Sequence, residues 1–151
     1  MHTSDDEADA MTSPSIRVDT DVSADDLVSL YDSVGWTTYT KEPQELALAV
    51  RQSLRVVTAW DGEILVGLAR VVGDGVTVIY LQDILIAPEH QRRGIGRSLM
   101  HEVFAPFGHV RQHVLLTDDE PRQRAFYESL GFTEAHDVRP GELRSFVRFA
   151  D

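Results

Sequence analysis

The residues best suited to chemistry lie in one stretch, residues 83–97, where an apolar run ends in a loop that enters a helical pattern. Gly94 and Gly96 remove side chains at the start of that helix. Free backbone N–H groups can therefore approach an anion closely, and the helix dipole favours negative charge there. Arg92, Arg93 and Arg97 add three positive charges within six residues of an otherwise acidic chain. The pattern predicts an anion-binding loop, with ordinary helix-start chemistry as the alternative.

Two common phosphate-binding loops are excluded by their spacing. The chain has no G-x-x-x-x-G-K followed by Ser or Thr. A dinucleotide-binding fingerprint would need a third small residue where Leu99 stands, and it would need to open a strand-helix-strand unit. The loop therefore binds its anion in another structural context.

The elements that position this loop are predicted from hydrophobic periodicity. A helix begins after Ser23, which forms a capping box with Asp26, and stops at Gly35. A second helix starts near Pro43, and three antiparallel strands follow at residues 55–60, 64–72 and 76–86, joined by glycine turns. A helix over 94–107 leads to a strand at 110–117, which the crossover makes parallel to the strand at 76–86. Further segments are an extended stretch at 16–19, a helix from Pro121 to Gly131, and extended stretches at 132–136 and 143–149.

This order predicts an α+β fold, an α/β sandwich in which a mixed, mostly antiparallel sheet has helices on both faces. It does not alternate as a Rossmann fold does. We expect a single domain over residues 15–151, preceded by an acidic tail at residues 1–14 that has almost nothing to bury and is therefore disordered.

The loop resembles the signature of the GNAT superfamily of acyl-CoA-dependent N-acetyltransferases: Gln or Arg, two free positions, Gly, one free position, then Gly or Ala. Residues 91–96 match at every position, and the predicted order of elements over residues 16–149 is also that of the family. A second block is similar to the family's terminal motif, shortened by one position before its tyrosine: Ala125, Phe126, Tyr127, Glu128, Ser129, Leu130, Gly131 and Phe132. The resemblance implies a splayed parallel strand pair and a GNAT-like acetyltransferase domain.

The resemblance also implies acetyl-CoA as co-substrate. The backbone of Ile84, Leu85 and Ile86 would pair with the pantetheine arm as an added strand does. An N–H group there, of Leu85 or Ile86, would polarise the thioester carbonyl. Many relatives carry an asparagine where this chain has Arg122, so that cofactor contact is either lost or replaced by charge pairing with a phosphate. The pyrophosphate would be held by Gln91, Arg92, Arg93, Gly94, Ile95, Gly96 and Arg97.

Two residues are candidates for proton transfer. Tyr127 is the candidate general acid, because a phenol with a reference pKa of about 10 can protonate a departing thiolate; a half-buried helix tyrosine is the alternative. Asp83 is the candidate base for the ammonium of the acceptor, or else a group that caps or orients a neighbouring loop. Glu89, His90 and His113 are weaker base candidates. The chain has no cysteine, which favours direct attack in a ternary complex over a cysteinyl acyl-enzyme.

The acceptor is predicted to be a small amine. By resemblance, the loop between the first two helices lines the acceptor pocket, and here it carries Trp36 and Tyr39. These rings would hold an aryl or alkyl amine by stacking or cation–π contact, although Trp36 could instead pack under the loop. Residues 34–40 and 82–85 are also similar to plant-type arylalkylamine acetyltransferases. Two other hypotheses are a non-catalytic acyl-CoA sensor or partner module, and a protein or peptide N-acetyltransferase.

Composition limits the partners. The formal charge of the 151-residue chain is -11, which repels nucleic acid and anionic membranes. No apolar run approaches the roughly 20 residues that span a bilayer, so we expect a cytoplasmic protein whose partners are an amine and, in a homodimer, a second copy. No histidine spacing suits a metal.

Lys41 is the only lysine, and this acidic, lysine-poor composition suggests a halophilic source, with an ordinary acidic protein as the alternative.

Overall fold

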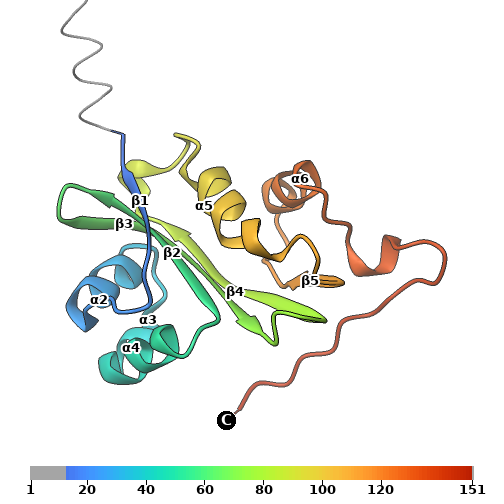
Figure 1. Cartoon of the computed structure of the whole chain (residues 1–151), viewed down its shortest axis with the longest axis horizontal. Helices are drawn as coiled ribbons and strands as arrows, with labels where there is room; N and C mark the ends of the chain where they lie inside the picture. The colour runs from blue at the N-terminus through green and yellow to red at the C-terminus, as the bar shows by residue number, and fades with distance from the viewer. Residues whose placement is uncertain (1–12, 151) are drawn as a thin grey trace, which may run out of the picture. The chain divides into compact units, whose positions relative to one another are not determined.

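The computed structural model describes residues 13–150, which form two compact units, one ending at Leu115 and one beginning at Leu116 (Figure 1). The first unit contains a five-stranded sheet of order β1-β2-β3-β4-β5. Its strands are β1 (Ser15–Val18), β2 (Arg55–Asp61), β3 (Ile64–Gly73), β4 (Val78–Ile86) and β5 (Gln112–Leu115). Its helices are α2 (Ala24–Ser33), α3 (Thr37–Thr40), α4 (Pro43–Arg51), η1 (Pro88–His90), α5 (Ile95–Phe104) and η2 (Ala105–Phe107).

The sheet topology confirms the predicted fold class. Strands β1 to β4 pair antiparallel in sequence order, and β5 pairs parallel with β4 after the crossover through α5. The second unit contains α6 (Pro121–Ser129) and η3 (Ala135–Asp137). The single domain predicted over residues 15–151 stays a prediction. The predicted acidic tail lies outside the described residues except for Ser13 and Pro14.

Local sequence signals explain where the first helix lies. The Ser23 hydroxyl accepts a hydrogen bond from the Asp26 N–H at 3.2 Å, which caps α2 as predicted. Gly35 follows its end with φ +80°, a left-handed conformation that costs glycine little. The apolar side of α2, which includes Leu27 and Leu30, is fully buried.

Helices cover both faces of the first unit's sheet (Figure 1). A Cβ atom placed on Gly67 of β3 would meet Leu99 and Ile95 of α5 at 3.2 and 3.4 Å, so this glycine lets α5 lie close to the sheet. Gly67 pairs with Ile86 of β4. Asp83, three residues before Ile86, points to the opposite face because side chains alternate along a strand. That face is covered by α2 and α4.

Several boundaries differ from the sequence prediction. Residues 37–40, expected as loop, form the short helix α3, and the helix expected over 94–107 changes to the tighter η2 where Pro106 cannot donate an α-helical hydrogen bond. The extended segments expected at 132–136 and 143–149 are not strands: η3 occupies part of the first, and the second has no regular structure. Alternating apolar residues indicate a strand only where a neighbouring strand supplies hydrogen bonds.

None of the helices among residues 13–150 is both long and apolar enough to cross a membrane.

Candidate active site

Strand β4 is paired on both sides along its first half only. Its parallel pairing with β5 runs from Val78 to Leu81. Its antiparallel pairing with β3 continues to Ile86. Within the described chain, residues 82–86 therefore have no strand partner on the β5 side. Such an open edge presents backbone donors and acceptors to which an extended ligand can bind as an added strand.

The two halves of β4 meet at a β-bulge. Asp83 pairs with Arg70 and Leu81 pairs with Val71, so Gln82 between them has no Cα partner on β3. An extra residue bends a strand and increases its local twist. The bulge lies directly after Leu81, the last residue of β4 that pairs with β5.

Backbone alternation shows which amides face the open edge. The Ala87 N–H donates to the Val66 carbonyl of β3 at 2.8 Å. Because successive amides along a strand point to opposite sides, the Leu85 N–H also faces β3, whereas those of Ile84 and Ile86 face the open side. Of the two N–H groups considered for polarising a thioester carbonyl, this alternation favours Ile86.

The arginine-rich loop directly follows this edge. The Gln91 side-chain amide donates to the Ile86 carbonyl at 3.0 Å, which ties the loop to the end of β4. Arg92 has φ +64° and Gly94 has φ +82°, so two left-handed residues turn the chain into α5. A non-glycine residue in that region stores backbone strain, and such strain gathers at ligand-binding sites. Left-handed residues also turn neighbouring N–H groups toward one concave surface that suits an anion.

The start of α5 is open. Among the described residues, no side chain caps this helix, whose cap position is held by Gly94. The N–H groups of a first helical turn have no partner within their own helix. A Cβ atom placed on Gly94 would meet no described atom within 4 Å. The side chains of Arg92, Arg93 and Arg97 are exposed around this space. A helix start, open space and exposed guanidinium groups are features that suit a phosphate, so the role predicted for this loop stays a prediction.

His90 fastens the loop to the β2–β3 hairpin. Its Nε2 lies 3.2 Å from Oδ2 of Asp61, and only 16% of its side chain is exposed. Its Nδ1 is buried and has no hydrogen-bond partner among residues 13–150. This ion pair gives His90 a positioning contact beside the arginine-rich loop.

Asp83 is buried in a network of hydrogen bonds. Its Oδ2 accepts from Arg70 Nε at 2.7 Å and from the Tyr31 hydroxyl at 2.8 Å, and Arg70 Nη1 donates to Ser53 Oγ at 3.3 Å. Asp83 is 3% exposed and Arg70 6%. Burial, then the Asp83 charge, raises the pKa of Tyr31 well above its usual range, so its hydroxyl remains a donor. The Asp83 carboxylate is thus paired with the Arg70 guanidinium inside the protein.

Aromatic side chains gather beside this network. The rings of Trp36 and Tyr39 lie 6.0 and 5.8 Å from the Tyr31 ring, in edge-to-face contact. Trp36 is half-buried and Tyr39 is 38% exposed. The Gln82 side-chain amide donates to the Tyr39 hydroxyl at 3.5 Å. The two aromatic residues that the sequence assigned to the acceptor are thus brought to the bulge of β4.

In the second unit, Tyr127 lies on α6 and is buried between the rings of Phe126 and Phe132, 5.1 and 6.1 Å away. Burial raises its pKa, and a hydrogen bond with Thr117 acts in the opposite direction. Its phenol therefore keeps its proton at neutral pH. Arg122 lies exposed in the first turn of the same helix.

The weaker base candidates have different surroundings. Nε2 of His113 lies 3.0 Å from the Phe107 carbonyl, and its ring stacks on Phe104 at 5.1 Å. These are structural contacts. Glu89 is exposed in η1.

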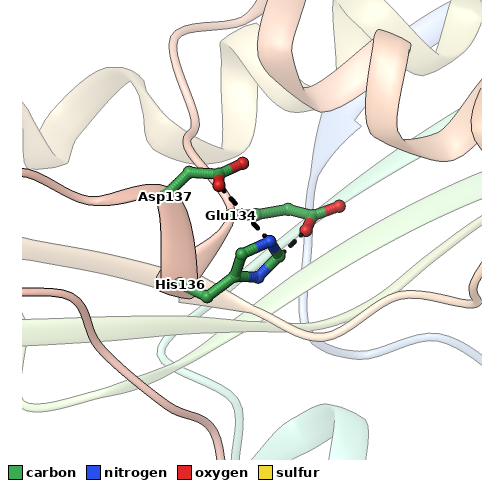
Figure 2. Close-up of side chains that lie close together, drawn as sticks. All are labelled: Glu134, His136 and Asp137. Carbon is green, nitrogen blue, oxygen red and sulfur yellow. Dashed lines mark ion pairs between the residues drawn. The ribbon is translucent and has the colours of Figure 1, made fainter.

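A cluster of exposed groups in the second unit was not predicted. Glu134, His136 and Asp137 place one ligand-type atom each within 4.8 Å of one another (Figure 2). His136 pairs with both carboxylates at 3.3 Å, and Arg124 pairs with them at 3.0 Å. These ion pairs account for the closeness of the three residues without a metal.

Sequence reasoning found the loop and the aromatic residues but missed Arg70, Tyr31 and Ser53. The sequence does hold one signal for this network, which is a charged residue within an apolar strand. Such a residue must be paired when it is buried. Arg70 and Asp83 both stand in such strands. The pairing itself depends on the register of β3 against β4, which the bulge shifts.

Comparison with known proteins gives a consistent result. Residues 52–134 match the acetyltransferase (GNAT) domain family. A putative acetyltransferase, FG08082 of Gibberella zeae, is 40% identical over 72 residues, which cover 46% of this chain and 40% of that protein. A second curated relative, an uncharacterized N-acetyltransferase of Porphyra purpurea, is matched over 66% of its length. The chain thus spans less than two thirds of these relatives.

Solved structures share the fold. A GNAT family acetyltransferase of Streptococcus pneumoniae, SP0256, is 33% identical with a TM-score of 0.77, covering 91% of this chain and 98% of that one. The aminoglycoside N-acetyltransferase AAC(6')-Iy, solved in complex with CoA, has a TM-score of 0.66 over 91% of this chain and 94% of that chain. At 16% identity, this second likeness concerns the fold alone.

Proposed function

Because this chain belongs to the GNAT acetyltransferase family, we propose that it transfers the acetyl group of acetyl-CoA to a primary amine by direct attack in a ternary complex. The observation that carries the proposal is the open half of β4, residues 82–86, which runs directly into a loop of exposed arginines at the start of a helix. An extended arm that ends in a pyrophosphate has the shape and charge for such a surface.

The cofactor would be held mainly by backbone groups. The N–H groups of Ile84 and Ile86 would pair with the pantetheine arm, and that of Ile86 would polarise the thioester carbonyl. The first turn of α5, with Arg92, Arg93 and Arg97, would hold the pyrophosphate. Arg122 would supply a further phosphate contact in place of the asparagine of other family members.

The chemistry requires protons to leave the amine and one proton to reach the sulfur. The acceptor ammonium first gives a proton to water, and its neutral nitrogen then forms a bond to the carbonyl carbon of the thioester. The carbon–sulfur bond breaks, and the nitrogen gives a second proton to water as the amide forms. The departing thiolate takes a proton from the hydroxyl of Tyr127, whose raised pKa keeps that proton available. For Asp83, the sequence left a base and an orienting role open, and its contacts with Arg70 and Tyr31 favour the second.

We propose Trp36 and Tyr39 as the acceptor-binding residues. Their rings, tilted by 55° to each other, are partly exposed and would hold an aryl or alkyl amine by stacking and cation–π contact, worth roughly 0.5 to 2 kcal/mol. This supports a small amine as the acceptor.

Release of free thiol from acetyl-CoA tests the proposal directly. The acceptor panel contains arylalkylamines, alkylamines, polyamines, amino acids and basic peptides, at low and at molar KCl. We expect turnover with a small aryl or alkyl amine and its loss in Tyr127→Phe, which removes one hydroxyl and keeps the ring. Turnover with peptides alone would instead identify a peptide acetyltransferase. Binding of acetyl-CoA without turnover of any amine would identify an acyl-CoA sensor and contradict the proposal.

The comparison of low with molar KCl also bears on the acidic, lysine-poor composition of the chain. We propose that the acidic, lysine-poor surface is an adaptation to high salt, where repulsion between exposed charges is screened over about 3 Å at 1 M. Unfolding midpoints should rise from low to molar KCl. Midpoints that stay level or fall would contradict the adaptation.

A further inference from the structure

We infer that Asp83 is a positioning residue that links the acceptor side of the site to the open half of β4, so that acetyl-CoA bound on β4 changes the surroundings of Trp36. This inference rests on the proposed function, because it takes the open edge as the cofactor-binding strand and the aromatic loop as the acceptor side.

Asp83 lies at the boundary between the two halves of β4. It stands between the bulge residue Gln82 and the open residues 84–86. Its carboxylate is fixed by Arg70 of β3 at 2.7 Å, and Arg70 is itself held by Ser53 at 3.3 Å. The backbone that would bind the thioester thus begins at a residue whose side chain cannot move without breaking a buried ion pair.

Tyr31 connects Asp83 to the acceptor side of the site. Tyr31 donates its hydroxyl proton to Asp83 at 2.8 Å and is fully buried. The same residue holds Trp36 twice: its carbonyl accepts from the Trp36 N–H at 3.0 Å, and its ring contacts the indole edge-on. One residue therefore bonds to the carboxylate on β4 and fixes both the backbone and the ring of Trp36.

A second contact runs in parallel with the first. The Gln82 side-chain amide donates to the hydroxyl of Tyr39 at 3.5 Å. Two successive residues at the bulge thus contact two tyrosines: Gln82 contacts Tyr39, and Asp83 contacts Tyr31. A chain of packed and hydrogen-bonded groups of this kind can carry a coupling free energy between two sites, and such coupling acts equally in both directions.

The experiment uses Trp36 as its own reporter. The chain has two tryptophans, so Trp60→Phe leaves Trp36 as the single emitter. In this background acetyl-CoA is titrated while Trp36 emission is followed and binding is measured in parallel by calorimetry. We expect saturating acetyl-CoA to change the emission. Adding Tyr31→Phe, which removes only the hydroxyl that bonds to Asp83, should reduce the amplitude at least about twofold while acetyl-CoA still binds.

Two further variants sharpen the test. Tyr80→Phe is the matched control. It removes a phenol hydroxyl from β4 that lies in the field of the Asp83 charge but forms no hydrogen bond with Asp83 among the described residues, so it should leave the amplitude unchanged. Asp83→Asn weakens the same link from its other end and should reduce the amplitude as Tyr31→Phe does. Urea unfolding of each variant confirms that it is folded at the titration temperature.

The outcomes separate the two proposals. If acetyl-CoA binds but Trp36 emission does not respond, or responds equally in Tyr31→Phe and Tyr80→Phe, the link is refuted while the proposed function stands. If calorimetry detects no binding of acetyl-CoA to the parent protein, the proposed function itself fails, and the inference that rests on it fails as well.

Discussion

The two halves of β4 share one burial pattern and differ in their strand partners. Buried and half-buried residues alternate along the whole strand. Yet residues 79–81 pair with strands on both sides, whereas residues 83–86 pair with β3 alone. A register shift of one residue at Gln82 separates the two groups. The open edge thus begins where the register shifts.

An open edge is normally a liability, because unpaired backbone groups invite pairing with other chains. Here the edge is short, lies within the sheet and is followed at once by the arginine-rich loop. The comparison indicates that β4 serves two purposes: its first half holds the sheet together, and its second half is available to a ligand. Substitutions that affect one half should therefore show whether the other half responds.

Asp83→Ala should have the largest effect. It leaves the guanidinium of Arg70 buried and unpaired, and breaking a buried ion pair costs about 3–5 kcal/mol of unfolding free energy. Urea unfolding measures the loss. The double variant Asp83→Ala with Arg70→Met removes both charges and should recover most of the stability. A loss below about 1 kcal/mol in the single variant would show that the pair does not anchor the bulge.

Gly94→Ala should weaken acetyl-CoA binding about tenfold. Its φ of +82° costs an alanine roughly 1–2 kcal/mol, and a methyl group there would occupy the open space at the start of α5. Calorimetry measures the affinity. Gly62→Ala is the matched control: its φ is +61°, and no described atom lies within 4 Å of the added Cβ. Equal losses of affinity in the two variants would contradict the assignment of the loop.

Tyr31→Phe should change how stability depends on alkaline pH. Burial raises the pKa of Tyr31 above the value of about 10 expected in the unfolded chain. The folded state therefore holds this proton more tightly, and the resulting stability is fully present below pH 10 and is lost as pH rises above it. The free energy of unfolding of the parent should fall above about pH 10 more steeply than that of Tyr31→Phe. Parallel curves would show that Tyr31 titrates alike in both states.

Asp74→Ala should have the smallest effect, and it acts on the paired half. The carboxylate of Asp74 accepts from the N–H groups of Val76, Thr77 and Val78 at the start of β4. Hydrogen bonds, first that of the Thr77 hydroxyl, lower its pKa, so its contribution is present above about pH 4 and is lost as pH falls further. Its replacement should remove that acid-dependent loss and leave acetyl-CoA affinity unchanged. A change in affinity would show that the two halves of β4 are not independent.

Much of the fold was predictable from sequence, since each element carries its own local signal. The cap at Ser23 and the crossover that makes β5 parallel to β4 were both predicted and are confirmed. The anion-binding loop was located by residue type and spacing, and its role stays a prediction. The bulge at Gln82 was not predicted, because buried and half-buried positions alternate through it without a break.

The buried network was beyond sequence reasoning for a related reason. Tyr31 and Asp83 are 52 positions apart, and Arg70 and Asp83 are 13 apart. Their contact depends on how α2 packs on the sheet and on the shifted register of β3 and β4. The strand predicted at residues 143–149 was wrong. Its apolar residues alternate as in a strand, but no neighbouring strand pairs with it in the described chain.

Amide hydrogen exchange along β4, followed residue by residue with NMR, tests the central claim most directly. In the free protein, the amides of Ile84 and Ile86 should exchange faster than those of residues 78–81 that are hydrogen-bonded within the sheet. Saturating acetyl-CoA should slow exchange at Ile84 and Ile86 and leave the paired half unchanged. Exchange at Ile84 and Ile86 that is unaffected by bound acetyl-CoA would contradict the claim that the open half of β4 is the cofactor-binding strand.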